Sequence, residues 1–258
     1  MKLISLLENT TQRTDLQTEH GLSLYLECAN RKILFDMGQT DRFAQNAQVL
    51  GVDLRAVDFA VLSHGHYDHG GGLRTFLDIN LHAPVYFHPD AFEPHYNGTE
   101  KYIGLDISLA DSPRLRRTGE KFSLAEGMTL FSCNQNDRPF DPPPSALMEQ
   151  RGDTFFPDDF RHEQYLLIEE SGKRILLSGC SHKGIRNLVT WFAPDVLIGG
   201  FHFSKCPLDE NLATIARELG CLSTEFYTCH CTGTEQFHFM REFMPNLHYL
   251  SCGQSLTL

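Results

Sequence analysis

The sequence has no long apolar run and no surplus of positive charge. None of its apolar stretches approaches the ~18 residues that a membrane-spanning helix requires, and residues 3–7 form too short a stretch for the core of a signal peptide. Lys and Arg number 22 against 33 Asp and Glu, which gives a net charge of −11. This balance excludes a broad basic face for nucleic acid, although a local basic pocket stays compatible with it. We therefore expect a cytoplasmic protein that binds neither a membrane nor nucleic acid.

The chain also lacks internal repeats and a recognisable domain linker. With 258 residues, it is long enough to bury a core without disulfide bridges. Because no secretory segment is recognised, we expect its eight cysteines to be reduced thiols, some of them near a metal. The sequence thus predicts a single domain over residues 1–258 and gives no indication of its oligomeric state.

The pattern of apolar runs changes along the chain. In the first half it predicts strands at 3–7, 22–28, 32–36, 57–62 and 84–88, with helices at 40–50 and after residue 72. In the second half it predicts a hairpin of residues 164–169 and 173–178. Helices at 184–192, 208–220 and 234–243 then alternate with strands at 195–199, 225–229 and 247–251. Hairpins followed by alternating helices and strands are typical of a layered α/β domain.

The segment from about residue 89 to 145 shows no such periodicity. It is rich in proline and contains the run Pro142-Pro143-Pro144. We expect an irregular insertion with one short strand near residues 128–132. Since a long irregular segment inside a compact domain is usually functional or disordered, we favour a lid over a site.

The strongest chemical signal follows the strand at 57–62. His64, His66, Asp68 and His69 lie within six residues and are followed by three glycines, residues 70–72. Imidazole and carboxylate groups are ligands of divalent transition metals. Four of them on one tight loop suit two adjacent ions better than one. The glycines allow a sharp turn into a helix whose N-terminus could receive an anion.

This loop resembles the signature of the metallo-β-lactamase fold superfamily. The upstream run Phe35-Asp36-Met37-Gly38 is similar to that superfamily's acidic motif, in which the Asp supports the metal loop. The resemblance extends over nearly the whole chain. It implies a four-layer αββα sandwich of two mixed sheets with a dinuclear metal site at one edge.

Three later motifs resemble a narrower subfamily of metal-dependent hydrolases. They contain Cys180-Ser181-His182, Gly200-Phe201-His202 and Cys229-His230-Cys231, and the opening Glu8-Asn9-Thr10 and the pair Glu163-Gln164 fit as well. Members of this subfamily are commonly named dihydropterin–ribofuranosylaminobenzene phosphate synthases.

Each later motif follows an apolar strand, so its histidine is expected at the end of a strand, where the sites of α/β proteins gather. His230 fits the superfamily's final metal ligand, and His182 is a further candidate ligand. His202 is a metal ligand, a substrate contact or a residue further from the metal that supports the site. Cys180 stands where many relatives carry a bridging Asp, and it is either a metal ligand or a packing residue.

Several other residues receive predictions of their own. Cys229 and Cys231 flank His230, and on an extended strand both would point away from its side and pack in the core. Lys183 and Arg186 either receive an anionic group or belong to an exposed helix face. The remaining histidines show no ligand pattern, although His88 and His95 lie near the expected lid and are candidates for substrate contact.

The leading hypothesis is a metal-dependent hydrolase that activates water for attack on a small, phosphorylated, ester or lactone substrate. Two divalent ions are expected, zinc first, with manganese or iron as alternatives. Asp68 would orient the water as well as bind metal, and His202 or His182 would give a proton to the leaving group. There are three alternatives. The first is the pterin-linked synthase, which would be a transferase or a lyase, the second is a di-iron redox protein, and the third is a non-catalytic binding module.

Overall fold

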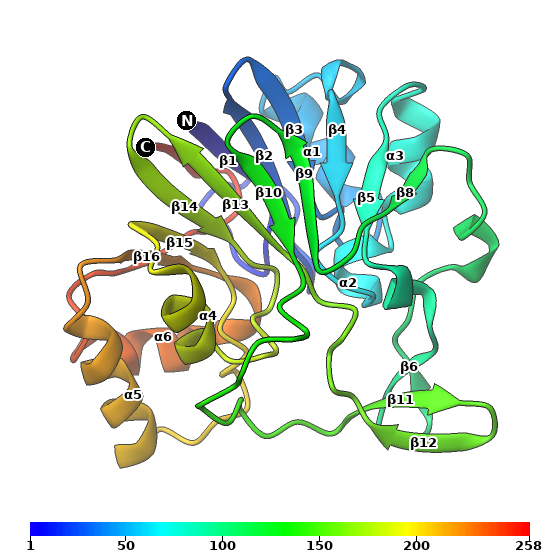
Figure 1. The fold of residues 1–258 in the computed structure, drawn as a ribbon. Coiled ribbons are helices and arrows are strands. Elements are labelled where there is room, and N and C mark those ends of the chain that lie inside the picture. The colour runs from blue at the N-terminus through cyan, green and yellow to red at the C-terminus, as the bar shows by residue number, and fades with distance from the viewer.

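Two seven-stranded sheets face each other in the computed structural model, which describes residues 1–258 (Figure 1). The first has the order β18-β1-β2-β3-β4-β5-β8. Its strands are β1 (Lys2–Leu7), β2 (Ser23–Cys28), β3 (Arg31–Phe35), β4 (Phe59–Val61), β5 (Val85–Phe87), β8 (Leu115–Arg117) and β18 (Ser255–Thr257). The second has the order β17-β16-β15-β14-β13-β10-β9. Its strands are β9 (Lys121–Ala125), β10 (Met128–Phe131), β13 (Tyr165–Glu170), β14 (Lys173–Leu177), β15 (Val196–Gly199), β16 (Glu225–Thr228) and β17 (Leu247–Tyr249).

Both sheets are mixed, and helices cover their outer faces. The strands from β3 to β8 and from β14 to β17 pair in parallel, and the other pairs are antiparallel. The helices are α1 (Arg42–Val49), α2 (Tyr67–Gly70) and α3 (Leu73–Ile79) beside the first sheet, and α4 (Ile185–Phe192), α5 (Glu210–Gly220) and α6 (Thr234–Arg241) beside the second (Figure 1). The expected four-layer αββα sandwich is confirmed. None of the helices combines the length and the apolar character that a membrane span needs.

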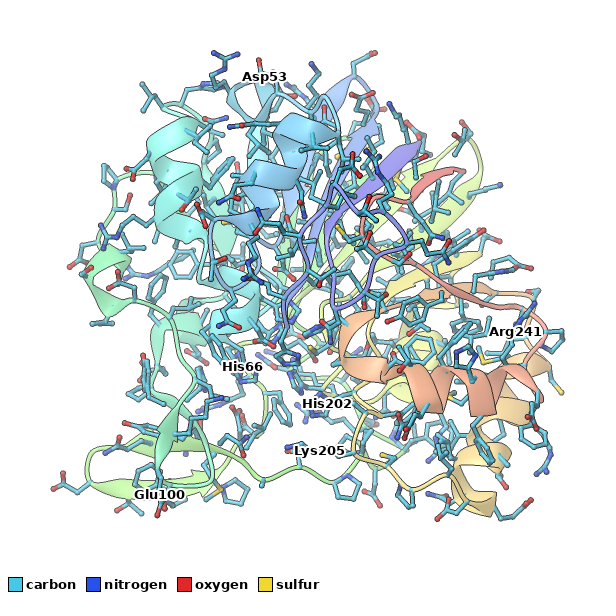
Figure 2. All side chains as sticks on the ribbon, turned by 180° about the vertical axis from the view of Figure 1, so that it is seen from behind. Asp53, His66, Glu100, His202, Lys205 and Arg241 are labelled. Atoms are coloured by element: carbon cyan, nitrogen blue, oxygen red, sulfur yellow. The ribbon has the colours of Figure 1, made fainter.

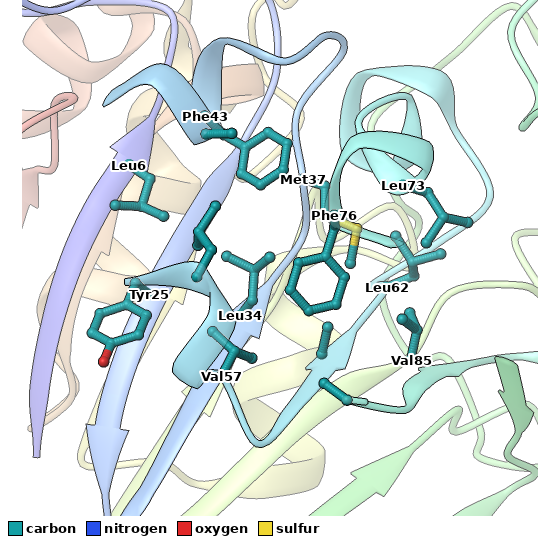
Figure 3. Packing of buried hydrophobic residues seen from close by; sticks show 14 of the residues in the cluster. Leu6, Tyr25, Leu34, Met37, Phe43, Val57, Leu62, Leu73, Phe76 and Val85 are labelled. Carbon is teal, nitrogen blue, oxygen red and sulfur yellow. The ribbon is translucent and has the colours of Figure 1, made fainter. Parts of the chain in front are cut away.

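The sequences of these strands are continuous apolar runs, because each large sheet is covered by the other sheet on one face and by helices on the other. Ile33 and Phe35 of β3 belong to the cluster between the sheets, whereas Leu34 packs on the opposite face with Phe43 of α1 and Phe76 of α3 (Figure 3). A third cluster joins the second sheet to α4, α5 and α6. Alternate residues of a strand therefore belong to different cores, which fixes its register.

The expectation of an irregular segment from residue 89 to 145 is wrong except for the short strand expected near residues 128–132, which is β10. The segment contains β8, β9 and β10, which extend the two large sheets, and two strands of a third sheet. That antiparallel sheet has the order β12-β11-β6-β7 and consists of β6 (His95–Asn97), β7 (Lys101–Tyr102), β11 (Leu147–Arg151) and β12 (Thr154–Pro157). Its strands are short and half-exposed, so they lack the apolar periodicity that marks a strand in a sequence. The role of the segment as a lid stays a prediction.

The loops that carry the histidine motifs gather at one edge of the sandwich. Asp36 follows β3 and Ser63 follows β4, two neighbouring parallel strands of the first sheet. Cys180, His202 and His230 follow β14, β15 and β16, which are neighbouring parallel strands of the second sheet. Because parallel strands end at the same edge, residues separated by up to 194 positions in the chain converge there.

Gly199 is required where β15 passes β14 on its way to this edge. It has a φ of +142°, and a Cβ at this position would collide with the carbonyl oxygen of Ser178. We expect Gly199→Ala to lower the free energy of unfolding by about 1–3 kcal/mol, because backbone must shift to admit the methyl group. Urea denaturation measures the effect. Gly119→Ala is the matched control, since nothing lies within 4 Å of a Cβ there, and equal stability of the two variants would contradict the prediction.

Candidate metal centre

A buried carboxylate holds the histidine loop in place. The backbone N–H and the hydroxyl of Ser63 donate to Asp36 at 2.7 Å each, and Nδ1 of His69 lies 2.6 Å from Oδ2 of Asp36. The Nδ1–H of His69 therefore donates to Asp36, and its Nε2 is directed to the other side of the ring. The expected support of the loop by Asp36 is confirmed by these contacts.

Two more histidines are oriented in the same way. Nδ1 of His64 lies 2.7 Å from Oγ of Ser63, and Nδ1 of His230 lies 2.8 Å from Oδ1 of Asn9. Since Oγ of Ser63 donates its proton to Asp36 and the amide oxygen of Asn9 is an acceptor, both Nδ1 atoms carry the proton. His64, His69 and His230 thus present Nε2 to a common space.

Several imidazole nitrogens in this space have no partner. Nε2 of His64, Nε2 of His66, both ring nitrogens of His182 and Nδ1 of His202 are buried without a hydrogen bond. Candidate donor atoms of His64, His66 and His182 lie within 4.8 Å of one another. Burying so many unpaired polar atoms is costly unless a ligand satisfies them. This donor set fits a divalent ion such as zinc.

A second group of donors lies directly beside the first. Oδ2 of Asp68 is 3.3 Å from Nε2 of His230, and Nε2 of His69 is 3.2 Å from Nε2 of His230. Sγ of Cys180 is 3.2 Å from Nε2 of His69, and a further candidate triad joins Cys180 with His64 and His69. Cys180 therefore lies between the two groups of donors.

The expectation that Cys231 points away from His230 is wrong. Its sulfur lies with Cys180 and His230 in one cluster of candidate ligands, and its S–H is 3.6 Å from the carbonyl oxygen of Cys180. The period-two argument fails because β16 ends at Thr228, and His230 begins a 3₁₀ turn with a φ of +48°. Cys229 packs between the sheets as expected.

His202 belongs to the same site. It follows β15 with a φ of +57°, its ring centroid is 4.3 Å from that of His182, and it forms a candidate triad with Cys180 and His182. His66 and His202 follow strands of different sheets but line the same cavity as Lys205, and Figure 2 labels all three. The structure thus brings together every residue for which the sequence predicted a metal-binding or catalytic role.

The site opens into a cavity of about 400 Å³. His66, Asp68, Cys180, His182, His202, His230 and Cys231 line its inner wall, whereas His64 and His69 lie behind them. Asn97 and Lys101 of the four-stranded sheet, Pro144 to Leu147, and Lys205 also line the cavity. The proline-rich segment therefore borders the cavity, as a lid would.

Neither prediction for Lys183 is correct. Lys183 is fully buried, and its Nζ donates to the carbonyl oxygens of Ser132 and Glu163 and to Oδ1 of Asn134. This ammonium group has no free donor for an anion. Arg186 forms an ion pair with Glu218 at 3.2 Å on the helix surface.

The sequence pointed to no metal-centre role for four residues next to the site: His20, His95, Asp158 and His162. Nε2 of His20 lies 3.1 Å from Oδ2 of Asp68, and His20 lines the cavity. His95, Asp158 and His162 form a buried cluster with His66. His95 was a candidate for substrate contact, but it lies in this cluster and does not line the cavity. The four-residue spacing of Asp158 and His162 just before an apolar strand is the one signal that pointed to part of the cluster. Nothing in the sequence linked His95 to it.

With this geometry established, the chain can be compared with known proteins. The family model of the metallo-beta-lactamase superfamily matches residues 19–210. The chain belongs to this superfamily. The matched range includes the histidine loop, His182 and His202 but ends before His230, so the place of His230 in the site rests on the contacts described above.

Individual relatives agree with both levels of resemblance seen in the sequence. An uncharacterized protein of Methanocaldococcus jannaschii is 28% identical over 244 residues, which cover 90% of this chain and 91% of that protein. The 7,8-dihydropterin-6-methyl-4-(beta-D-ribofuranosyl)-aminobenzene-5'-phosphate synthase of the same organism is 27% identical over 268 residues, covering 92% and 89%.

Solved structures show the same fold. Tm1679, described as a metal-dependent hydrolase of the beta-lactamase superfamily, matches with a TM-score of 0.87 and 26% identity over 100% of this chain and 99% of that one. Zn²⁺-bound PqqB from Methylobacterium extorquens matches with a TM-score of 0.62 and 13% identity over all of both chains, which shows the fold alone.

Acidification should destabilise the metal-free form of this protein. Burial is the main cause that lowers the pKa of His64, His66, His162 and His182, and the pKa of His162 falls to about 3. The unfolded chain binds protons at these groups below pH ~6.5. The folded chain keeps these four histidines neutral at the same pH. The stability that they contribute is therefore fully present above pH ~6.5 and is lost as the pH falls below it. We expect the free energy of unfolding after EDTA treatment to drop by roughly 3 kcal/mol or more between pH ~7 and ~5.

The stability that His69 contributes should depend on pH in the opposite direction. Burial lowers its pKa, but the carboxylates of Asp36 and Asp68 outweigh that effect and raise the pKa to about 9. The stability that His69 contributes is present below pH ~6.5 and is lost as the pH rises through about 9. Urea denaturation of the metal-free protein should thus show maximal stability near neutral pH. A flat profile would contradict both assignments.

Cys231 and Cys229 offer a matched pair of variants. Both are buried neighbours, but one sulfur lies among the candidate ligands and the other in the core. We expect Cys231→Ala to lower zinc affinity by about 10-fold or more, whereas Cys229→Ala leaves it unchanged and costs some stability. Competition with a chromophoric chelator measures the affinity, and equal affinities would show that Cys231 does not contribute to metal binding.

Proposed function

We propose that this protein is a hydrolase that uses a pair of divalent metal ions, with zinc preferred. The observation that carries the proposal is the convergence of unpartnered buried imidazole nitrogens on one cavity, beside a carboxylate and two thiols. A purely structural cluster has no reason to leave these nitrogens unpaired, since each costs free energy when it is buried without a partner.

The donors divide into two sets. His64, His66 and His182 would hold one ion, and Asp68, His69 and His230 would hold the other. Cys180 lies within reach of both sets.

Thiolate ligands favour zinc over the harder ions that prefer oxygen donors, and this preference makes zinc the first choice here. When bound, the ions supply Lewis acidity and lower the pKa of a coordinated water toward ~7.

Two residues of this chain would take part in hydrogen bonding to the attacking water and in proton transfer to the leaving group. Burial raises the pKa of Asp68, but His69, His20 and His230 outweigh this effect and hold it well below its usual value, so Asp68 is a carboxylate. It can accept a hydrogen bond from the attacking water and orient it. His202 lines the cavity with an unpartnered Nδ1, and it would deliver a proton to the leaving oxygen as the bond to that oxygen breaks.

The cavity favours a small substrate with an anionic group. Its volume of about 400 Å³ is in the range for small-molecule sites. Lys101 and Lys205 line it in a chain whose net charge is −11, so they provide local attraction for a phosphate or carboxylate group. We therefore favour a small phosphoester, or an ester or lactone that carries a negative charge.

The name of one relative supports an alternative chemistry. The Methanocaldococcus jannaschii relative at 27% identity is named as a synthase of a dihydropterin-linked ribofuranosylaminobenzene 5'-phosphate. A synthase of this kind would use the same cavity and leave simple esters intact. Turnover of simple substrates therefore separates the two functions.

Metal content and hydrolysis test the proposal together. Protein purified without added metal should contain about two zinc ions per chain, as measured by elemental mass spectrometry. It should also hydrolyse a chromogenic phosphodiester, ester or lactone. The double variant His64→Ala/His66→Ala should lose metal and about 100-fold or more of the activity.

The variant His82→Ala/His238→Ala is the matched control, because both of its histidines are exposed on the surface. It should retain metal and activity. Iron in place of zinc would favour the redox alternative, and a folded protein that binds no metal would refute the proposal.

A further inference from the structure

A second cavity lies beside the one that borders the metal centre, and the proposed chemistry does not use it. Its volume is about 450 Å³. Four buried apolar side chains from α4, from the loop after β15 and from α5 line it: Ile185, Phe203, Leu212 and Ile215. We call it the apolar cavity, and we call the one at the metal centre the metal cavity. Its lining suits an apolar group, because a polar group buried there without a partner would cost free energy.

The proline-rich segment before β11 forms another wall of the apolar cavity. Phe140 and the three prolines at 142–144 line it. The N–H of Phe140 donates to Oδ1 of Asn187 at 3.1 Å, and Nδ2 of Asn187 donates to the carbonyl oxygen of Phe140 at 2.7 Å. Further along, the carbonyl oxygen of Ala146 accepts the N–H of Gly98 at 2.8 Å. The wall is therefore attached to α4 at one end and to the four-stranded sheet at the other (Figure 1).

The apolar cavity and the metal cavity adjoin each other. Pro144 and Cys206 line both of them. Pro144 is exposed and Cys206 is half-buried, so the boundary between the two cavities lies at the surface and not in the core. A ligand that lies across these two residues can therefore occupy both cavities at once.

The walls of the apolar cavity favour a flat group over a flexible chain. Rings of phenylalanine and proline form much of the lining, and the guanidinium carbon of Arg186 lies 4.4 Å from the centroid of the Phe140 ring. Aromatic groups pack well against other rings and against guanidinium planes. A ring also loses less conformational entropy on binding than an alkyl chain does. The charge of Arg186 is already paired with Glu218 at 3.2 Å, so this wall does not require an anion.

We propose that the apolar cavity binds an aromatic group of the substrate whose reacting bond lies at the metal centre. This inference rests on the proposed function, because it assigns both cavities to one substrate. Lys101 and Lys205 in the metal cavity would attract the anionic end of that substrate. The substrate class is then a small ester or phosphoester that carries a negative charge near the reacting bond and an aromatic group at the other end.

Isoleucine methyl groups report on the two cavities separately. Ile185 and Ile215 line the apolar cavity, and Ile103 lines the metal cavity. The probes are phenylpropylphosphonate and methylphosphonate, which share an anionic head that resists hydrolysis. In methyl NMR spectra of the purified, isoleucine-labelled protein, we expect both probes to shift Ile103 and only the phenyl compound to shift Ile185 and Ile215. If the phenyl compound at millimolar concentration shifts neither Ile185 nor Ile215, the proposal is wrong.

A pair of variants on α5 tests the location of the aromatic group. Asn211 and Thr214 are both exposed, but only Asn211 lines the apolar cavity. We expect the wild type to bind phenylpropylphosphonate about 10-fold or more tightly than methylphosphonate. Asn211→Trp should remove most of this difference by filling the cavity and leave the affinity for methylphosphonate unchanged. Thr214→Trp is the matched control and should keep the difference. Isothermal titration calorimetry gives the affinities, and a difference that persists in Asn211→Trp would overturn the proposal.

Hexylphosphonate tests the preference for an aromatic group. It carries an alkyl chain in place of the ring, and we expect it to bind more weakly than phenylpropylphosphonate. Equal affinities for the two compounds would refute the assignment to an aromatic group.

The outcomes separate this inference from the proposed function. If the protein contains zinc and hydrolyses simple substrates but Ile185 and Ile215 do not respond, the inference fails alone. If it contains no metal and hydrolyses none of them, while the phenyl compound still shifts both residues, the apolar cavity is upheld as a binding site and the hydrolase is refuted.

Discussion

The buried carboxylate of Asp36 is the contact on which the whole centre depends. It accepts three hydrogen bonds, two from Ser63 and one from His69, at 2.6–2.7 Å. Burying a carboxylate is costly unless its oxygens are well paired, and these short bonds offset that cost. Because β3 and β4 are adjacent and parallel, Asp36 and Ser63 meet just beyond their ends. The apolar clusters on the two faces of the first sheet hold β3 and β4 in place. The position of the histidine loop therefore follows from the packing of the sandwich.

The surroundings of the centre determine which nitrogen of each histidine faces the cavity. Ser63, Asp36 and Asn9 each bind one Nδ1. The backbone carries strain at the same places, because Asp36, Ser181, His202 and His230 all have φ values between +48° and +60° without being glycines. Such conformations cost about 1–3 kcal/mol each and persist only where packing enforces them. Their concentration around one cavity is typical of a functional site.

Much of the fold and the site was predictable from the sequence, because strong local signals carried it. The apolar runs marked most strands of both large sheets but missed the edge strands β8, β9 and β18. The histidine loop has a spacing with few structural alternatives. The four-stranded sheet was not predictable, since its short strands pair across about 50 residues and are only half-buried. Cys231 was misplaced because a 3₁₀ turn replaces the expected strand. The prediction for Lys183 was wrong because its three acceptors come from distant segments of the chain.

The hydrogen bonds of Glu8 and Asn9 to His230 affect the order in which the centre forms while the chain is synthesised on the ribosome. Glu8 accepts the backbone N–H of His230 at 2.6 Å across 222 positions of the chain, and Asn9 binds the ring across 221. Contacts of such high sequence separation form late, because loop closure precedes any gain from them. The loop of His64 and His66 emerges from the ribosome long before His230 does. A nascent chain that has released His182 can therefore bring His64, His66 and His182 together while His230 is still absent, so the two proposed sets of donors become complete in a fixed order.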